Sequence, residues 1–332
     1  MNAELRSPYP EDPPLPLTRR RFLASAAALA AGCAGTRGAS VSPPRLAAPT
    51  ACEIGENPLW HPDERIVFFL DIARGIVHAH DPVAGSHREF SRGPVTGGML
   101  LQEDGRLVLL QDGRISILGF DGGQREVRKG LSPEGVRFND GIADPEGRIY
   151  TGELGGKGRM MRFDRDGRMT VLGEGYGVPN GWGFTPDLRQ VYFTDSIPRL
   201  LYRFDYDRAT GDLSNRRVFA EIPQAEGVPD GMAVDAEGHV WTAVWFGARL
   251  KRYAPDGRLE REVRFPVRQT SAVCFGGPDL SDLYVTSSAT DAADSLKPPG
   301  YDVTAAPRGG GLYALRAEGL RGAPLFRSRV AF

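Results

Sequence analysis

"DPEGRIYTGEL", residues 144–154, is one copy of a motif that recurs along the chain and indicates its fold. Each copy begins with a turn rich in Pro, Asp and Gly and continues through a polar residue into a run of residues that favour β-strands. The other copies are "HPDERIVFFLD" at 61, "QEDGRLVLLQD" at 102, "TPDLRQVYFTDS" at 185, "DAEGHVWTAVW" at 235 and "GPDLSDLYVTSS" at 277. Successive copies begin 41, 42, 41, 50 and 42 residues apart, and a second strand-like piece with its own turn follows each one.

This repeat predicts an all-β fold. Short strand-forming runs cut by Asp-Gly or Pro-Asp turns are typical of antiparallel hairpins, and no long window of the repeats shows helical periodicity. Units of about 40–50 residues are the usual size of a propeller blade. A β-sandwich built by duplication is the competing interpretation, but it does not explain six copies. We therefore expect a six-bladed β-propeller of four-stranded antiparallel blades.

The first fifty residues differ in composition from the repeats. In residues 17–35, "LTRRRFLASAAALAAGCAG", Arg19 and Arg20 precede an Ala-rich apolar run that is too short to span a membrane. Basic, apolar and small-residue regions in this order predict an export signal of the twin-arginine type over residues 1–35. An amphipathic N-terminal helix with a chance basic patch is the alternative.

The segment that follows contains a candidate lipid anchor and a candidate linker. "AAGC", ending at Cys33, loosely fits a lipoprotein processing site, so we expect an exported protein that is periplasmic or lipid-anchored. Residues 36–50 are expected to form a flexible linker, and residues 51–332 the propeller domain. The two cysteines of that domain, Cys52 and Cys274, form either a disulfide or two separate buried thiols.

The charges of the chain are balanced, with 41 basic and 42 acidic residues and a formal net charge of −1 at pH 7. This balance gives no electrostatic basis for nucleic acid or an anionic membrane surface as the main partner. We expect a small-molecule substrate, no nucleic acid, and membrane contact only through a lipid anchor at Cys33.

Two matching frames, "GVPNG" (177–181) and "GVPDG" (227–231), point to a site. They differ only at Asn180 and Asp230, and the equivalent segments of two other units contain Glu56 and Asn139 (the latter followed by Asp140). The innermost strands of a propeller face its central channel, where carboxylate and amide oxygens suit a hard cation such as Ca²⁺. The five histidines all fall in turn or outer-strand patterns. For a single position, Asn or Asp before Gly in a turn with positive φ explains the pattern equally well, but the repetition favours a metal site.

Several longer motifs resemble one known family. "GENPLW", "RFNDGIADPEGRIYTG", "VPNGWGFTPDLRQVYFTDS" and "PDGMAVDAEGHVWTAVW" look like motifs of the gluconolactonase/regucalcin/luciferin-regenerating-enzyme family of sugar lactonases, in the family's order. The resemblance extends over nearly all of the chain after the signal, from about Ile54 to Leu315. It implies a metal-dependent enzyme.

The resemblance also implies individual roles. Glu56, Asn180 and Asp230 match the residues that bind one divalent cation, Ca²⁺ by first expectation and Zn²⁺ as the alternative. Arg137 matches a substrate-contacting arginine, Asn139 matches a residue that contacts either the substrate or a metal-bound water, and Asp230 matches the general base. The family has a further substrate-binding glutamate, for which Glu153 is the nearest candidate, although "ELGGKGR" departs from the usual pattern.

The first functional hypothesis is a metal-dependent lactonase that opens a sugar lactone. The cation polarises the carbonyl, and Asp230 takes the proton of the attacking water; alternatively the metal lowers the pKa of its own water and Asp230 only orients it. Residues 287–311 form a long surface loop that either covers the channel mouth or is only a solvated excursion.

Two rival hypotheses remain open from the sequence. One is hydrolysis of aryl esters or organophosphates at the same metal, which channel aromatics would favour. The candidates for such aromatics are Trp182, Phe138, Trp245 and Phe246. The other rival is an exported propeller that binds a ligand without catalysis.

Overall fold

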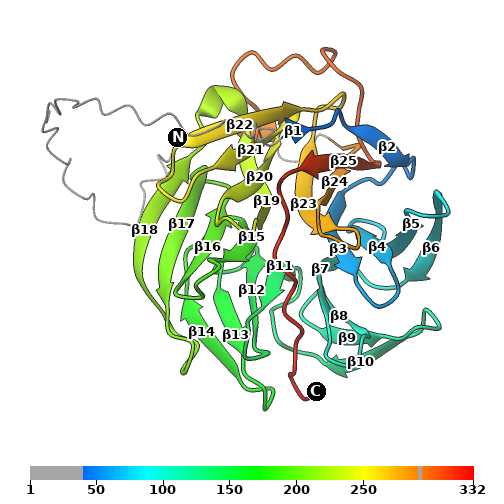
Figure 1. Cartoon of the computed structure of the whole chain (residues 1–332). Helices are drawn as coiled ribbons and strands as arrows, with labels where there is room; N and C mark the ends of the chain where they lie inside the picture. The colour runs from blue at the N-terminus through cyan, green and yellow to red at the C-terminus, as the bar shows by residue number, and fades with distance from the viewer. Residues whose placement is uncertain (1–39, 291–293) are drawn as a thin grey trace, which may run out of the picture. The chain divides into compact units, whose positions relative to one another are not determined.

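The computed structural model describes residues 40–290 and 294–332, which form six antiparallel sheets (Figure 1). Blades 1 and 2 are built from β3 (Gly55–His61), β4 (Ile66–Asp71), β5 (Ile76–Asp81) and β6 (Ser86–Arg92), and from β7 (Thr96–Leu101), β8 (Leu107–Gln111), β9 (Ile115–Leu118) and β10 (Gln124–Arg128). Blades 3 and 4 are built from β11 (Arg137–Ala143), β12 (Ile149–Leu154), β13 (Met160–Phe163) and β14 (Met169–Gly173), and from β15 (Pro179–Phe184), β16 (Gln190–Asp195), β17 (Leu200–Tyr206) and β18 (Leu213–Glu221). Blades 5 and 6 are built from β19 (Val228–Val234), β20 (Val240–Trp245), β21 (Arg249–Tyr253) and β22 (Leu259–Arg264), and from β23 (Thr270–Gly276), β24 (Asp282–Ser287), β25 (Leu312–Glu318), β1 (Ser40–Val41) and β2 (Arg45–Ala48).

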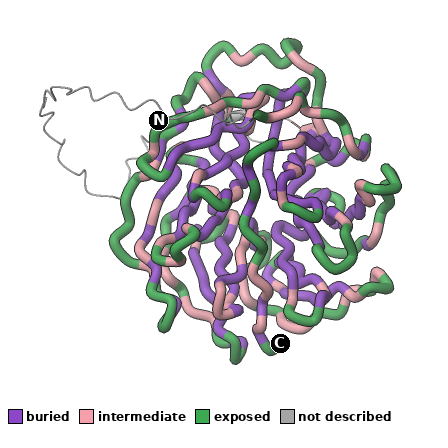
Figure 2. The backbone as a smooth tube through the Cα atoms, in the orientation of Figure 1, coloured by how far each residue is buried: buried purple, intermediate pink, exposed green. Residues whose placement is uncertain are grey.

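The six-bladed propeller expected from the repeat is confirmed. The innermost strands β3, β7, β11, β15, β19 and β23 contact one another in a closed ring. Apolar side chains fill the spaces between neighbouring sheets, and one such core joins Trp241 and Leu250 of blade 5 to Val273 and Leu283 of blade 6. The strands of the propeller are mostly buried, as the colours of Figure 2 show. The expected export signal over residues 1–35, with Cys33, lies outside the described residues.

The expected linker over residues 36–50 is corrected by the pairing of its second half. β1 and β2 pair antiparallel with β25, so residues 40–48 complete blade 6 at its outer edge. The ring is therefore closed by strands from both ends of the chain, and the propeller begins before residue 51. Ala48 is completely buried in the core shared with Trp60 and Cys274.

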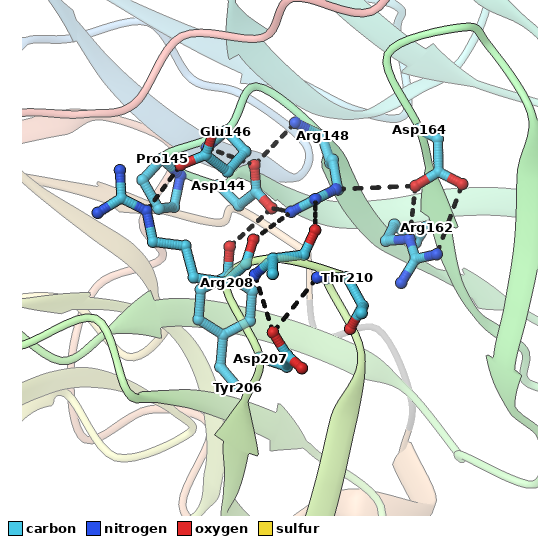
Figure 3. A network of polar contacts seen from close by, with 12 residues as sticks. Asp144, Pro145, Glu146, Arg148, Arg162, Asp164, Tyr206, Asp207, Arg208 and Thr210 are labelled. Carbon is cyan, nitrogen blue, oxygen red and sulfur yellow. Dashed lines mark hydrogen bonds and ion pairs between the residues drawn. The ribbon is translucent and has the colours of Figure 1, made fainter.

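The recurring turn motif owes its form to hydrogen bonds of its first aspartate. Asp144 Oδ1 accepts hydrogen bonds from the backbone N–H groups of Glu146 and Arg148, and its Oδ2 accepts from Arg148 Nη1 and Tyr206 Oη (Figure 3). Asp235 holds the equivalent turn of blade 5 in the same way, through Oδ1 and the backbone of Glu237 and His239. The repeat signal is thus structural and lies at the ends of the blades away from the candidate site.

Cys52 and Cys274 are both buried and form no disulfide, so they are separate buried thiols. The described part of the chain has two short 3₁₀ helices, η1 (Gln224–Glu226) and η2 (Asp294–Leu296), and no helix there is long and apolar enough to cross a membrane.

The segment after β25 crosses the end of the channel at which the inner strands finish. This end is called the lower end, and the end at which the inner strands begin is called the upper end. The segment forms bridges with Asp235 and Gln102 through Gly322 and Ser328, and it is the red segment that runs over the ends of the inner strands in Figure 1. Residues 323–326 line the lower channel cavity. The open mouth lies at the other end, where the inner strands begin.

Candidate metal centre and substrate cavity

Four inner strands direct one polar side chain each to a common level of the channel. Glu56 of β3, Asn139 of β11, Asn180 of β15 and Asp230 of β19 are each only 5–6% exposed and line one cavity of about 190 Å³. The structure thus brings together all four residues that the sequence placed at equivalent positions, and Arg137 lines the same cavity.

A β-bulge directs these side chains inward. The strand register shifts between Glu56 and Leu59, between Phe138 and Gly141, between Asn180 and Trp182, and between Pro229 and Met232. A bulge re-aims a side chain and ends regular pairing, which is a common arrangement beside active sites.

The second glycine of each frame serves close packing, not a turn. Gly181 and Gly231 lie inside β15 and β19 without positive φ. A Cβ on Gly231 would lie 2.4 Å from the Cβ of Ala272 on the neighbouring inner strand. The explanation of the frames as turns with positive φ is therefore wrong for these residues.

A chain of hydrogen bonds fixes the two amides. Arg137 Nη1 donates to Asn139 Oδ1 at 2.6 Å, and Asn139 Nδ2 donates to Asn180 Oδ1 at 3.1 Å. Asn180 Nδ2 donates in turn to Ser196 Oγ at 3.0 Å. Each of the two amide oxygens accepts one of these hydrogen bonds and keeps a second lone pair, but the donor to Asn139 Oδ1 is the cationic Arg137, which makes Asn180 Oδ1 the better ligand for a cation.

Three carboxyl groups are buried near one another at this level. Burial, followed by the charges of Asp230 and Asp140, raises the pKa of Glu56 well above its usual value. Burial and the charge of Asp140 raise the pKa of Asp230, and burial raises the pKa of Asp140 to about 6. Arg137 is the positive neighbour of all three, and burial lowers its own pKa. One guanidinium does not balance three carboxylates, so the site lacks positive charge.

The donor set fits a hard divalent cation. Asp230 Oδ1 is buried and has no hydrogen-bond partner among the described residues, and an unpaired buried carboxylate oxygen is costly unless a cation or donor meets it. Glu56 Oε2 accepts the backbone N–H of Asn57 at 2.9 Å, and the carboxyl groups of Glu56 and Asp230 lie within hydrogen-bonding reach of each other. Glu56, Asn180 and Asp230 therefore offer carboxylate and amide oxygens of the kind that Ca²⁺ prefers.

Asp140 was noted in the sequence but assigned no role, and the structure places it next to this site. Its Oδ1 accepts a hydrogen bond from Asn57 Nδ2 at 3.2 Å, and Asn57 has a left-handed backbone with φ of 45°. Asp140 lines the lower cavity, on the other side of the ring from the open mouth. The bulge between Phe138 and Gly141 places Asn139 at one cavity and Asp140 at the other, so strand alternation alone does not predict this position.

Glu153, the nearest candidate for a further substrate-binding glutamate, is engaged elsewhere. It forms an ion pair with Arg159 and accepts a hydrogen bond from Ser132 Oγ at 2.5 Å. It does not line the cavity, whereas its neighbour Leu154 does.

The four channel aromatics take different places. Trp245 lines the upper cavity, and Trp182 lines the lower one. Phe138 is completely buried in the core between blades 2 and 3. Phe246 packs against Tyr301 of the long loop, with ring centroids 5.1 Å apart.

The described part of the long loop, from residue 294, contacts the rim of the mouth. Leu296 lines the upper cavity, and its carbonyl oxygen accepts a hydrogen bond from Arg199 Nη2 at 3.3 Å. At Leu296 the loop therefore contributes to the wall of the mouth, which favours the first of the two expectations for it.

A second acidic group, Asp235, Glu237 and His239, is close enough to hold a metal. Arg252 occupies that position, since its guanidinium donates to Asp235 Oδ2 and to Glu237 Oε2 at 2.6 and 2.8 Å. This cluster is an ion-pair network of blade 5.

Several known proteins resemble this chain in sequence or in fold. A family model described as the SMP-30/Gluconolactonase/LRE-like region matches residues 54–289. Pentonolactonase XacC of Haloferax volcanii is 40% identical over 285 residues, 85% of this chain and 96% of that protein. The 6-deoxy-6-sulfogluconolactonase of Pseudomonas putida is 34% identical over 243 residues, 71% of this chain and 83% of that protein. The structure of regucalcin from Agrobacterium tumefaciens, described as a calcium-binding protein, has a TM-score of 0.75 at 27% identity and covers 85% of this chain and 97% of that chain.

Proposed function

The chain belongs to the SMP-30/gluconolactonase/LRE-like family, and from that premise we propose that it is a hydrolase that opens sugar lactones with one divalent cation. The observation that carries the proposal is the buried ring of Glu56, Asn180 and Asp230, where Asp230 Oδ1 has no partner beneath the open cavity. The lactonase names of two relatives and the calcium-binding description of regucalcin support it.

When bound at this ring, the cation supplies a Lewis acid for the lactone carbonyl; Ca²⁺ is our first choice and Zn²⁺ the second. Asp230 accepts the proton of the attacking water on a carboxylate oxygen. Water adds to the carbonyl carbon, the ring C–O bond breaks, and the released ring oxygen takes up a proton. The products are a hydroxy acid and, at neutral pH, the proton that this acid loses.

Arg137 and Asn139 position the substrate. Arg137 uses Nη1 to reach the carbonyl oxygen of Phe138 and Asn139 Oδ1, and its other N–H groups donate to an oxygen of the lactone. Asn139 holds this guanidinium in place and, through Nδ2, orients the amide of Asn180. By binding and orienting the lactone, these two residues reduce the entropic part of the activation barrier.

The test is lactone hydrolysis by the full chain. Glucono-1,5-lactone and a panel of pentono- and hexono-lactones would be followed with and without chelator, with Ca²⁺ or Zn²⁺ restored, and with Asp230→Asn. We expect activity that chelator removes, that the cation restores and that the variant lacks. Asp121→Asn is the matched control, because Asp121 lies in an exposed turn and an asparagine preserves its bond to the Gly123 N–H. Rates equal to spontaneous hydrolysis over the whole panel would refute the proposal.

Aryl-ester hydrolysis is the second candidate, and the position of Trp245 in the cavity favours it. Phenyl acetate distinguishes the two: a kcat/KM above that of every lactone would make the protein an esterase, and a lower value leaves lactone opening as the main reaction.

We also propose that residues 1–35 export the protein, on the twin-arginine pattern of Arg19 and Arg20. Fractionation of cells that express the full chain or an Arg19→Lys, Arg20→Lys double variant tests this. Export of the first and retention of the second are expected, and equal distributions would contradict it.

A further inference from the structure

Above the ring, four cross-strand pairs form the wall of the cavity. Each pair joins the start of an inner strand to the end of the second strand in the same blade. The pairs are Ile54 with Ile72, Arg137 with Leu154, Val178 with Ser196, and Val228 with Trp245. Six of these eight residues are apolar, and Leu296 of η2 adds another apolar side chain.

The two polar members lie on neighbouring blades. Arg137 belongs to blade 3, and its guanidinium extends over blade 2, where a Cβ on Gly97 would lie 2.5 Å from Nη1. Ser196 follows β16 of blade 4, and its Oγ accepts the hydrogen bond from Asn180, which leaves the hydroxyl hydrogen unused in that bond. Blades 2 to 4 therefore form an edge of the cavity with hydrogen-bonding groups.

Among the described residues that line the opposite edge above the ring, the indole N–H of Trp245 is the single side-chain hydrogen-bonding group. Blades 5 and 1 contribute Val228, Trp245, Ile54 and Ile72, and Leu296 comes from the loop of blade 6. In a six-membered ring, blades 6 and 1 face blades 3 and 4. The cavity thus has a polar side and an apolar side.

A polyhydroxylated ring does not match such a cavity. A hydroxyl held against the side chains of Ile54 and Ile72 loses its water without gaining a partner, and an unpaired buried polar group is unfavourable. A methyl group in the same place gains contact with apolar side chains.

We propose, building on the lactonase function above, that the preferred lactone carries a methyl or short alkyl group on the side that faces Ile54 and Ile72. Its hydroxyl groups face Arg137 and Ser196. The substrate class is therefore a 6-deoxy sugar lactone or another lactone with one alkyl edge, in preference to a lactone that is hydroxylated all around.

Matched lactones test this on the full chain. L-Fucono-1,4-lactone and L-galactono-1,4-lactone differ only in a methyl group against a hydroxymethyl group, and L-rhamnono- and L-mannono-1,4-lactone form a second pair. We expect kcat/KM to be about 10-fold or more higher for the methyl member of at least one pair. Equal values, or preference for the hydroxymethyl members in both pairs, would overturn the inference while leaving the lactonase function intact. No hydrolysis of these or of any other sugar lactone would overturn both.

Two isosteric substitutions test the asymmetry of the wall. Val228→Thr adds a hydroxyl on the apolar side, and Val178→Thr adds the same group on the polar side. The ratio of kcat/KM within a matched pair does not depend on the amount of folded protein. We expect Val228→Thr to reduce the preference for the methyl lactone several-fold and Val178→Thr to leave it within about twofold. Trp245→Gln, at a half-buried position, is the second variant for the apolar side. Equal ratios in all variants would contradict the proposal.

Discussion

Asp140→Asn should stabilise the protein without its cation and weaken binding of the cation. Asp140 is buried against the ring, and its pKa is raised by burial to about 6 from an ordinary 3.8. A carboxyl group with a higher pKa in the folded chain binds more protons when folded, so its contribution to stability falls as the pH rises from about 4 to above 6. This difference in pKa corresponds to a loss of about 3 kcal/mol in the free energy of unfolding at neutral pH. The asparagine removes this charge and retains an oxygen for the hydrogen bond from Asn57 Nδ2.

Thermal unfolding in chelator, from pH 4 to pH 8, measures this effect. The variant should equal the wild type near pH 4 and exceed its melting temperature by about 5 °C at pH 7.5. The order should reverse in Ca²⁺, because the variant has lost one of three carboxylates that attract the cation. A variant that is less stable than the wild type in chelator at pH 7.5, or that binds Ca²⁺ as tightly, would refute this reasoning.

Three further outcomes are expected. Deletion of residues 1–48 should lower the melting temperature by about 10 °C or more relative to deletion of residues 1–39, because β25 keeps β24 but loses β1 and β2. Similar melting of both truncations would argue against closure by these strands. Arg137→Lys should lower kcat/KM about 10- to 100-fold without changing Ca²⁺ affinity, since an ammonium cannot replace the guanidinium fork; calorimetry and kinetics together check this. Asp235→Asn should lower the free energy of unfolding, measured by chemical denaturation, by about 3–5 kcal/mol, because it leaves the buried Arg252 without its main carboxylate. It should leave Ca²⁺ affinity unchanged, and a loss of Ca²⁺ binding would place the metal at blade 5.

The fold was readable from the sequence because one physical element recurs. The Asp144 and Asp235 turns repeat the same side-chain-to-backbone hydrogen bonds, so the same letters recur in each blade. Closure was not readable, because β1 and β2 have only two and four residues and no alternation of polar and apolar side chains. Their pairing with β25 depends on contacts between residues about 270 positions apart, such as Ser40 with Glu318.

The ring was readable for a similar reason. Glu56, Asn139, Asn180 and Asp230 occupy equivalent positions in similar frames, so the sequence itself aligns them. The wall of the upper cavity could not be predicted from the sequence, because Ile72 and Trp245 come from the ends of second strands and reach the cavity only through strand register. Strand alternation, applied to Phe138 between Arg137 and Asn139, would have placed that ring in the core.

Calorimetric titration of Ca²⁺ into the chelator-treated full chain, repeated with Asp230→Asn, tests most directly whether the ring of Glu56, Asn180 and Asp230 binds a divalent cation. One site per chain is predicted for the wild type, with affinity reduced about 100-fold or more in the variant and unchanged in Asp121→Asn. Binding of equal strength in the wild type and Asp230→Asn, or no binding of Ca²⁺ or Zn²⁺ by a folded wild type, would contradict it.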